Sequence, residues 1–217
     1  MRGVAPGRVV VNPLAPSGWG VYLVTDRAQT GGRALIDVVG AALQGGIRAV
    51  QLRERDMSAR ELLALAVRLR ESTRAAGAAL LINDRVDVAL ACDADGVHLP
   101  AASFAIADAR ALLGPHRLIG VSTHTTEEVA AAGRTGADFA VFGPIYETPS
   151  KQAYGAPLGL TALAAARSAA SLPLFAIGGI NHERAADIRA AGADGIAVIR
   201  AVLAAPDPAH AAAALLR

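Results

Sequence analysis

The 217-residue chain is poor in cysteine and in aromatic residues, with one cysteine and 4% Phe, Trp and Tyr. The single Cys92 has no partner for a disulfide within the chain, which excludes a disulfide-stapled extracellular scaffold and favours the reducing cytoplasm. No apolar run approaches the roughly 18 residues of a membrane span, and prolines and glycines interrupt the N-terminal region where a signal peptide would be apolar. We therefore expect no membrane association.

The sequence also lacks a strong charge imbalance. The formal net charge is +2, and the lysines and arginines are scattered, which gives no electrostatic case for nucleic acid. The 53% hydrophobic and 18% charged residues instead favour a large buried core. A small anionic ligand needs only a few well-placed cations, so a small molecule is the expected partner.

Short β-branched segments alternate with Ala- and Leu-rich helical segments along most of the chain, as in βα units around a parallel sheet. We expect eight strands, over residues 21–26, 49–54, 79–84, 96–100, 118–123, 139–145, 172–179 and 195–201. The related segments GGIRAVQL, CDADGVHL, TGADFAVF and AGADGIAV begin at residues 45, 92, 135 and 191, before every second expected strand. The prediction is an α/β fold, a single-domain (β/α)8 TIM barrel over residues 20–217, with residues 1–19 as a flexible extension. The first strand lacks a G-x-G-x-x-G turn, which disfavours an open doubly wound sheet.

Polar residues gather at the expected C-terminal ends of the strands, where barrels of this kind build their sites. Along the chain they are Thr25, Asp26, Gln51, Arg53, Arg55, Asn83, Asp84, His98, Ser122, Thr123, His124, Thr148, Ser150 and Lys151. Gln51, Arg53 and Arg55 alternate, so we expect all three to face the barrel interior, with Glu54 facing the helices. An anion, or salt bridges to Asp26 or Asp84, would offset the buried charge.

The last two strands end in Gly178 and Gly179 and in Ile199 followed by Arg200. Glycines let the backbone approach an anion closely, and the amides of a following helix attract negative charge. The loop with Thr148, Ser150 and Lys151 adds the donors that a phosphate needs. We predict a phosphate site here, with a simple tight turn as the alternative for the two glycines.

These segments resemble the thiamine phosphate synthase/TenI superfamily, from VYLVTD through QLRERDMSAR, LINDRVD, DGVHLP, GVSTHT, FGPIYETPSK and AIGGI to ADGIAVI. Synthases of this family join hydroxymethylpyrimidine diphosphate to a thiazole phosphate with magnesium and release pyrophosphate. Family members often form homodimers. The resemblance implies that the pyrimidine or its diphosphate lies near Gln51, Asn83 and Ser122, the diphosphate on Arg53, Arg55 and Lys151, the thiazole phosphate at Thr148, Ser150, Gly179 and Ile199–Arg200, and magnesium at Asp84.

Ser103, in the segment HLPAASF, stands where synthases carry a second metal-binding Asp. This departure resembles the TenI branch, whose thiazole tautomerases aromatise a carboxythiazole phosphate without metal. The resemblance places a catalytic histidine at His124, and histidine suits proton transfer near neutral pH. We therefore expect first a thiazole tautomerase without a cofactor, with Ser103 near the substrate. The alternatives are a magnesium-dependent thiamine phosphate synthase and a non-catalytic thiazole-phosphate-binding protein.

His124 also precedes a predicted helix start. Thr125 and Glu128 have the spacing of a capping box, in which a threonine hydroxyl and a glutamate satisfy the first amides of a helix.

Overall fold

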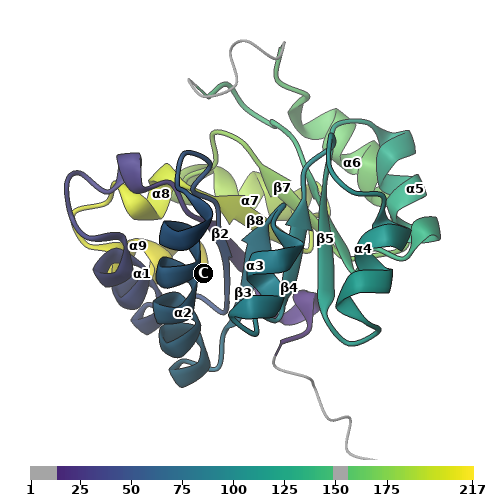
Figure 1. Ribbon diagram of the computed structural model, residues 1–217. Helices are drawn as coiled ribbons and strands as arrows, with labels where there is room; N and C mark the ends of the chain where they lie inside the picture. Colours follow the sequence, from purple (N-terminus) through teal and green to yellow (C-terminus); the bar gives the residue numbers. More distant parts are fainter. Residues whose placement is uncertain (1–13, 149–155) are drawn as a thin grey trace, which may run out of the picture.

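Eight parallel strands form one closed barrel in the computed structural model, which describes residues 14–148 and 156–217 (Figure 1). The strands are β1 Val21–Val24, β2 Ala49–Leu52, β3 Ala79–Asn83, β4 Gly96–Leu99, β5 Leu118–Thr123, β6 Phe139–Phe142, β7 Leu174–Ile177 and β8 Gly195–Val198. Each strand pairs with its neighbours in sequence, and β1 pairs with β8 to close the ring. The predicted (β/α)8 barrel is confirmed.

Helices surround this barrel (Figure 1). They are α1 Leu35–Gln44, α2 Ala59–Ala75, α3 Val86–Ala91, α4 Ile106–Leu113, α5 Thr126–Thr135, α6 Gly159–Ala169, α7 His182–Ala190, α8 Arg200–Leu203 and α9 Pro208–Leu215, with 3-10 turns η1 Pro16–Gly18 and η2 Arg27–Gln29. Among the described residues, no helix is long and apolar enough to cross a membrane.

Several strands end earlier than the sequence pattern predicts. The pattern carried the first strand to residue 26 and the second to residue 54, whereas β1 ends at Val24 and β2 at Leu52. Alternation in the sequence continues past the last paired residues, but the ladder stops at Val24 and Gln51 between β1 and β2. The polar residues that follow therefore lie in loops at the C-terminal rim of the barrel, hereafter the rim.

The apolar residues form two layers, because successive strand residues point to opposite faces. An outer layer lies between the strands and the helices, and an inner cluster fills the barrel. Trp19 belongs to the inner cluster: it is 1% exposed and stacks on Tyr22, with ring centroids 5.6 Å apart. Residues 14–19, which the sequence assigned to the extension, thus include a buried part of the barrel.

The internal repeat has a structural counterpart at the opposite end of the barrel. Asp95, Asp138 and Asp194 immediately precede β4, β6 and β8. Their carboxylates accept the backbone N–H of Leu80, Ile119 and Leu174, at the starts of β3, β5 and β7, at 2.8, 2.7 and 2.8 Å respectively. Each also pairs with an arginine of a preceding helix, namely Arg70, Arg110 and Arg167. The repeated aspartates therefore tie consecutive strands together.

Candidate functional site

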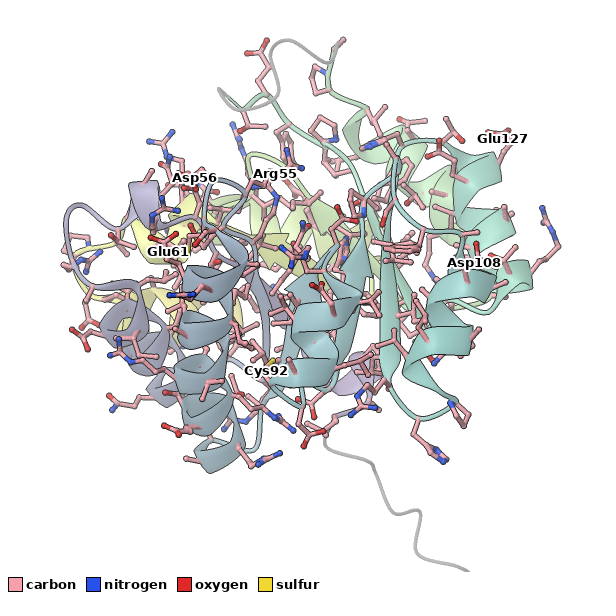
Figure 2. The ribbon with its side chains drawn as sticks, in the orientation of Figure 1. Arg55, Asp56, Glu61, Cys92, Asp108 and Glu127 are labelled. Carbon is pink, nitrogen blue, oxygen red and sulfur yellow. The ribbon has the colours of Figure 1, made fainter. Side chains whose placement is uncertain are left out.

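The end of β2 places only part of the predicted polar row inside the barrel. Gln51 is buried at 3% exposure, and its amide donates to the hydroxyl of Tyr22 at 3.1 Å. Arg53 is half-buried, whereas Arg55 is exposed in a turn beyond the strand. Figure 2 shows Arg55 at the upper edge of the barrel in that view. The expectation that Arg55 also faces the interior is wrong, because the strand geometry that it required ends at Leu52.

Glu54 explains why the chain turns here. Its carboxylate is buried, accepts the hydroxyl of Thr25 at 2.7 Å and accepts the backbone N–H of Arg27 at 3.1 Å. The Arg27 side chain also bridges Glu54 and Asp56 at 3.2 and 2.6 Å. These contacts between the ends of β1 and β2 fix the loop that carries Arg53 and Arg55.

Asp84, at the end of β3, lies beside Ser103 from the loop after β4. The Ser103 hydroxyl donates a short hydrogen bond to the Asp84 carboxylate. Asp84 also adopts a φ of 66°, a left-handed backbone conformation that is uncommon outside glycine and is concentrated at functional sites. The structure thus joins the carboxylate that was predicted to hold magnesium to the serine that replaces the second one.

Asp84 and Ser103 fit magnesium only as an ion that is also held by a bound diphosphate. In the described part of the chain, no group of three or more His, Cys, Asp and Glu side chains lies where it could hold a metal ion. Magnesium, however, commonly binds through one or two carboxylates, several waters and the phosphate oxygens of a substrate. Asp84 therefore suits a magnesium ion that arrives with a diphosphate, and it does not suit a site made of protein ligands alone.

Ser122 and His98 meet inside the barrel. Nε2 of His98 lies 3.0 Å from the Ser122 hydroxyl oxygen, and the His98 ring is 3% exposed. Burial, and more weakly the nearby charge of Arg53, lowers the pKa of His98 to about 3, so the imidazole is neutral. The sequence placed His98 only among the polar residues near the strand ends, since strand periodicity cannot show which side chain its ring will meet.

Ser103 and Ser122 also share a cavity of about 530 Å³, which is lined as well by Thr123, Phe104 and Ile106. This hollow lies between the ends of β4 and β5 and the helices α4 and α5, since Ala107, Ala131 and Thr135 line it too. Asn83 is level with His98 in the sheet register, one strand away from this hollow.

His124 lies at the rim just before α5, and the predicted capping box is confirmed: Thr125 accepts the Glu128 amide while Glu128 accepts the Thr125 amide. The His124 backbone N–H donates to Glu128 at 2.5 Å, and its Nδ1 lies 2.6 Å from the carbonyl oxygen of Gly143. A carbonyl only accepts, so Nδ1 carries the hydrogen and Nε2 is the basic nitrogen of the neutral ring. This arrangement permits proton transfer at Nε2.

The predicted phosphate residues that the structure describes lie beyond the ends of β6, β7 and β8. The loop after β6 is tied to the end of β7, because Ile145 and Tyr146 donate to the carbonyls of Ile177 and Gly178 at 2.8 and 3.1 Å. Gly178 and Gly179 have φ of 106° and 64°, and a Cβ on Gly179 would lie 2.6 Å from the carbonyl oxygen of Glu147. Only glycine fits this close approach.

Thr148 follows directly on this loop and is half-buried, whereas Ser150 and Lys151 lie outside the described residues. On the other side, Ile199 is the N-cap of the short helix α8, which begins at Arg200. Loops after the seventh and eighth strands with a short extra helix are a recurrent phosphate site in TIM barrels. The position of these residues fits the predicted site, and their role stays a prediction.

Arg184 was not among the predicted residues. It lies in the first turn of α7, where its guanidinium donates to the Gly179 carbonyl at 2.6 Å and stacks over the Tyr146 ring at 4.5 Å. It therefore fixes the glycine turn from the helix side. The sequence signal was a basic residue in the first turn after strand seven, which is unusual at the positive end of a helix dipole.

A family model described as "Thiamine monophosphate synthase" matches residues 21–202. The chain belongs to this family. A Geobacter sulfurreducens protein is 54% identical to it over 203 residues, covering 94% of this chain and 95% of that protein. The thiamine-phosphate synthase of Roseiflexus castenholzii is 49% identical over 209 residues, covering 95% and 92%.

Among solved structures, the thiamine phosphate pyrophosphorylase from Pyrococcus furiosus superposes on this thiamine monophosphate synthase family member with a TM-score of 0.83. The two are 36% identical, and the match covers 94% of each chain. The resemblance found in the sequence is confirmed, and the chain is an enzyme of thiamine biosynthesis by family. The relatives carry the name of the synthase, so they favour the alternative reading over the tautomerase that the sequence led us to expect.

Proposed function

We propose that this protein is a thiamine-phosphate synthase, which joins hydroxymethylpyrimidine diphosphate to a thiazole phosphate and releases pyrophosphate. The observation that carries the proposal is the combination of Arg53 and Arg55 after β2 with Asp84 after the neighbouring β3. Guanidinium groups suit a diphosphate, whereas a carboxylate among them suits the magnesium that a diphosphate brings. The names of the relatives support the same choice.

The barrel geometry suits two phosphorylated substrates. In a closed ring of eight strands, β2 and β3 lie across the mouth from β6 and β7. We infer that the diphosphate binds on the first side, near Arg53 and Arg55, and the thiazole phosphate on the second, near Gly178 and Gly179. Ser122 lies between these sides at the end of β5. The two rings would then meet over the centre of the barrel.

The synthase reaction requires the protein to stabilise the leaving pyrophosphate. The thiazole nitrogen forms a bond to the methylene carbon of the pyrimidine while the C–O bond from that carbon to the diphosphate breaks, so negative charge builds on the departing pyrophosphate. We expect Arg53 and Arg55, which follow β2 at the rim, to bind that charge. Orientation of both substrates would supply much of the remaining rate enhancement. Magnesium, bound through Asp84 and the diphosphate oxygens, would neutralise part of the same charge.

The tautomerase remains a second candidate, because two observations favour it. Ser103 supplies a hydroxyl instead of a second carboxylate beside Asp84. His124 has its Nδ1 hydrogen held by Gly143, which leaves Nε2 to move a proton. For this reaction His124 would be the acid and base, and its replacement by alanine would cost about 100-fold or more in kcat.

A two-substrate assay tests the choice. The purified protein is given the pyrimidine diphosphate with the thiazole phosphate, or the carboxythiazole phosphate alone, each with magnesium or with a chelator. The synthase predicts product from the first pair with magnesium only, and loss of that product in Asp84→Ala but not in Asp87→Ala, whose carboxylate pairs with Arg85 on the surface. Metal-independent turnover of the single substrate, abolished in His124→Ala, would replace it by the tautomerase.

A third outcome is informative as well. Binding of the thiazole phosphate without turnover of either substrate would contradict both enzymes and identify a binding protein. Sedimentation of the same sample would test the expected homodimer. The cytoplasm is the compartment that we propose for this function.

A further inference from the structure

His98 has no part in the function proposed above, yet it is a polar side chain in the centre of the barrel. Its ring lies beside those of Tyr22 and Phe139, with centroid distances of 5.9 Å to each. Nε2 contacts the Ser122 hydroxyl, whereas Nδ1 is buried and has no hydrogen-bond partner within the described residues. A leucine or phenylalanine would fill this space without leaving a polar atom unpaired.

The unpaired Nδ1 indicates which nitrogen carries the hydrogen. A neutral imidazole has one N–H donor and one accepting nitrogen. If Nε2 accepted from Ser122, the hydrogen would sit on Nδ1 and a buried donor would have no acceptor. Orphaned buried N–H groups are rarer than under-satisfied acceptors, and an unsatisfied buried group costs free energy. The favoured tautomer therefore has the hydrogen on Nε2, which donates to the Ser122 oxygen.

The direction of the His98–Ser122 hydrogen bond determines where the Ser122 hydroxyl can donate. His98 pairs with Gly120 in the register of β4 and β5, so Ser122 stands one inward-facing position nearer the rim. Once the Ser122 oxygen accepts the Nε2–H of His98, the Ser122 hydroxyl hydrogen must point away from His98. Ser122 is half-buried and stands near the end of β5, so its hydroxyl hydrogen is free for a substrate bound at the rim.

We propose that His98 is a positioning residue: its Nε2–H holds the Ser122 oxygen so that Ser122 presents a hydrogen-bond donor to an acceptor atom of the bound substrate. The inference rests on the proposed function only for the identity of that substrate. The tautomer and the direction of the His98–Ser122 hydrogen bond are properties of the free protein. They can be measured whether or not the protein is a synthase.

The first test reads the tautomer directly in the full chain. Histidine is labelled with ¹⁵N, and a long-range ¹H–¹⁵N correlation spectrum is recorded at neutral pH. His98 is the buried one among five histidines, and His98→Gln assigns its signals. A ring protonated on Nε2 and not on Nδ1 supports the proposal. A ring protonated on Nδ1, or on both nitrogens, overturns it even if the enzyme is a synthase.

The second test separates positioning from structure. His98→Leu keeps the volume but removes the donor, and His98→Gln keeps an amide N–H near the place of Nε2. We expect His98→Leu to be at least as stable as the parent protein, because a buried unpaired nitrogen is removed. We also expect it to lose about five- to tenfold in kcat/KM, the value of one hydrogen bond, whereas His98→Gln retains most of the activity.

A double variant completes the argument. Ser122→Ala and His98→Leu remove the same hydrogen bond. The double variant is therefore expected to lose no more kcat/KM than Ser122→Ala alone. Full activity in His98→Leu, or losses that multiply in the double variant, would show that His98 does not act through Ser122. If the parent protein has neither activity, the proposed function fails, and the spectrum still decides the tautomer.

Discussion

The largely buried Asp95–Arg70 pair at the base of the barrel should contribute more to stability than the exposed ion pairs of Asp93, two residues away. Asp95 and Arg70 side chains are 10% and 14% exposed, and their two N–O distances are 2.6 and 3.0 Å. The same carboxylate accepts the Leu80 amide at 2.8 Å. Asp95→Asn would keep the shape of the side chain and remove its charge. The new amide NH2 group would face the N–H donors of Arg70 or Leu80.

The expected cost follows from burial. Breaking a fully buried ion pair by removing one partner costs about 3 to 5 kcal/mol. We expect about 3 kcal/mol for Asp95→Asn, because this pair keeps some exposure and the oxygen of asparagine still accepts one hydrogen bond. For a domain of this size each kcal/mol lowers Tm by roughly 2 to 4 °C, so Tm should fall by roughly 6 to 12 °C.

Asp93→Asn is the matched control. Asp93 is 67% exposed and pairs with Arg74 and Arg117, which are 61% and 30% exposed. Asparagine also tolerates the φ of 52° at this position. Solvent screens this pair, so the loss should stay below about 1 kcal/mol. Thermal and urea unfolding of both variants measure the difference. Equal effects in the two variants, large or small, would refute the link between burial and stability used here.

Three further outcomes follow from the geometry. Because burial lowers the pKa of His98 from 6.5 to about 3, its imidazole binds a proton in the unfolded chain at pH values where it stays neutral in the folded protein. Stability should therefore fall as pH falls below 6.5, by about 2 kcal/mol at pH 5, and urea unfolding of His98→Gln should lack this part of the loss. Gly179→Ala should raise KM for the thiazole phosphate, since its Cβ would press on the Glu147 carbonyl, whereas Gly114→Ala, with open space around its Cβ, should leave KM unchanged. Under the synthase proposal, Ser103→Asp should lower the half-saturating magnesium concentration by roughly tenfold and Ser103→Asn should not; an unchanged magnesium titration would speak against metal binding at Asp84.

The sequence alone determined the barrel and the set of residues at its rim. Eight β-branched segments separated by helical ones permit few arrangements, and the carboxyl ends of parallel strands must meet at one end. The capping box after His124 was equally readable, because its partners are three residues apart. These features rest on local spacing, which periodicity reports directly.

Which rim residues face one another depends on the arrangement of the strands in space. Glu54 and Thr25, His98 and Ser122, and Ser103 and Asp84 are 29, 24 and 19 residues apart in the chain. No local pattern encodes such pairs, since they depend on the stagger of neighbouring strands and on where each strand ends. That is why Arg55 left the interior when β2 ended, why Trp19 joined the core, and why His98 lies beneath Ser122.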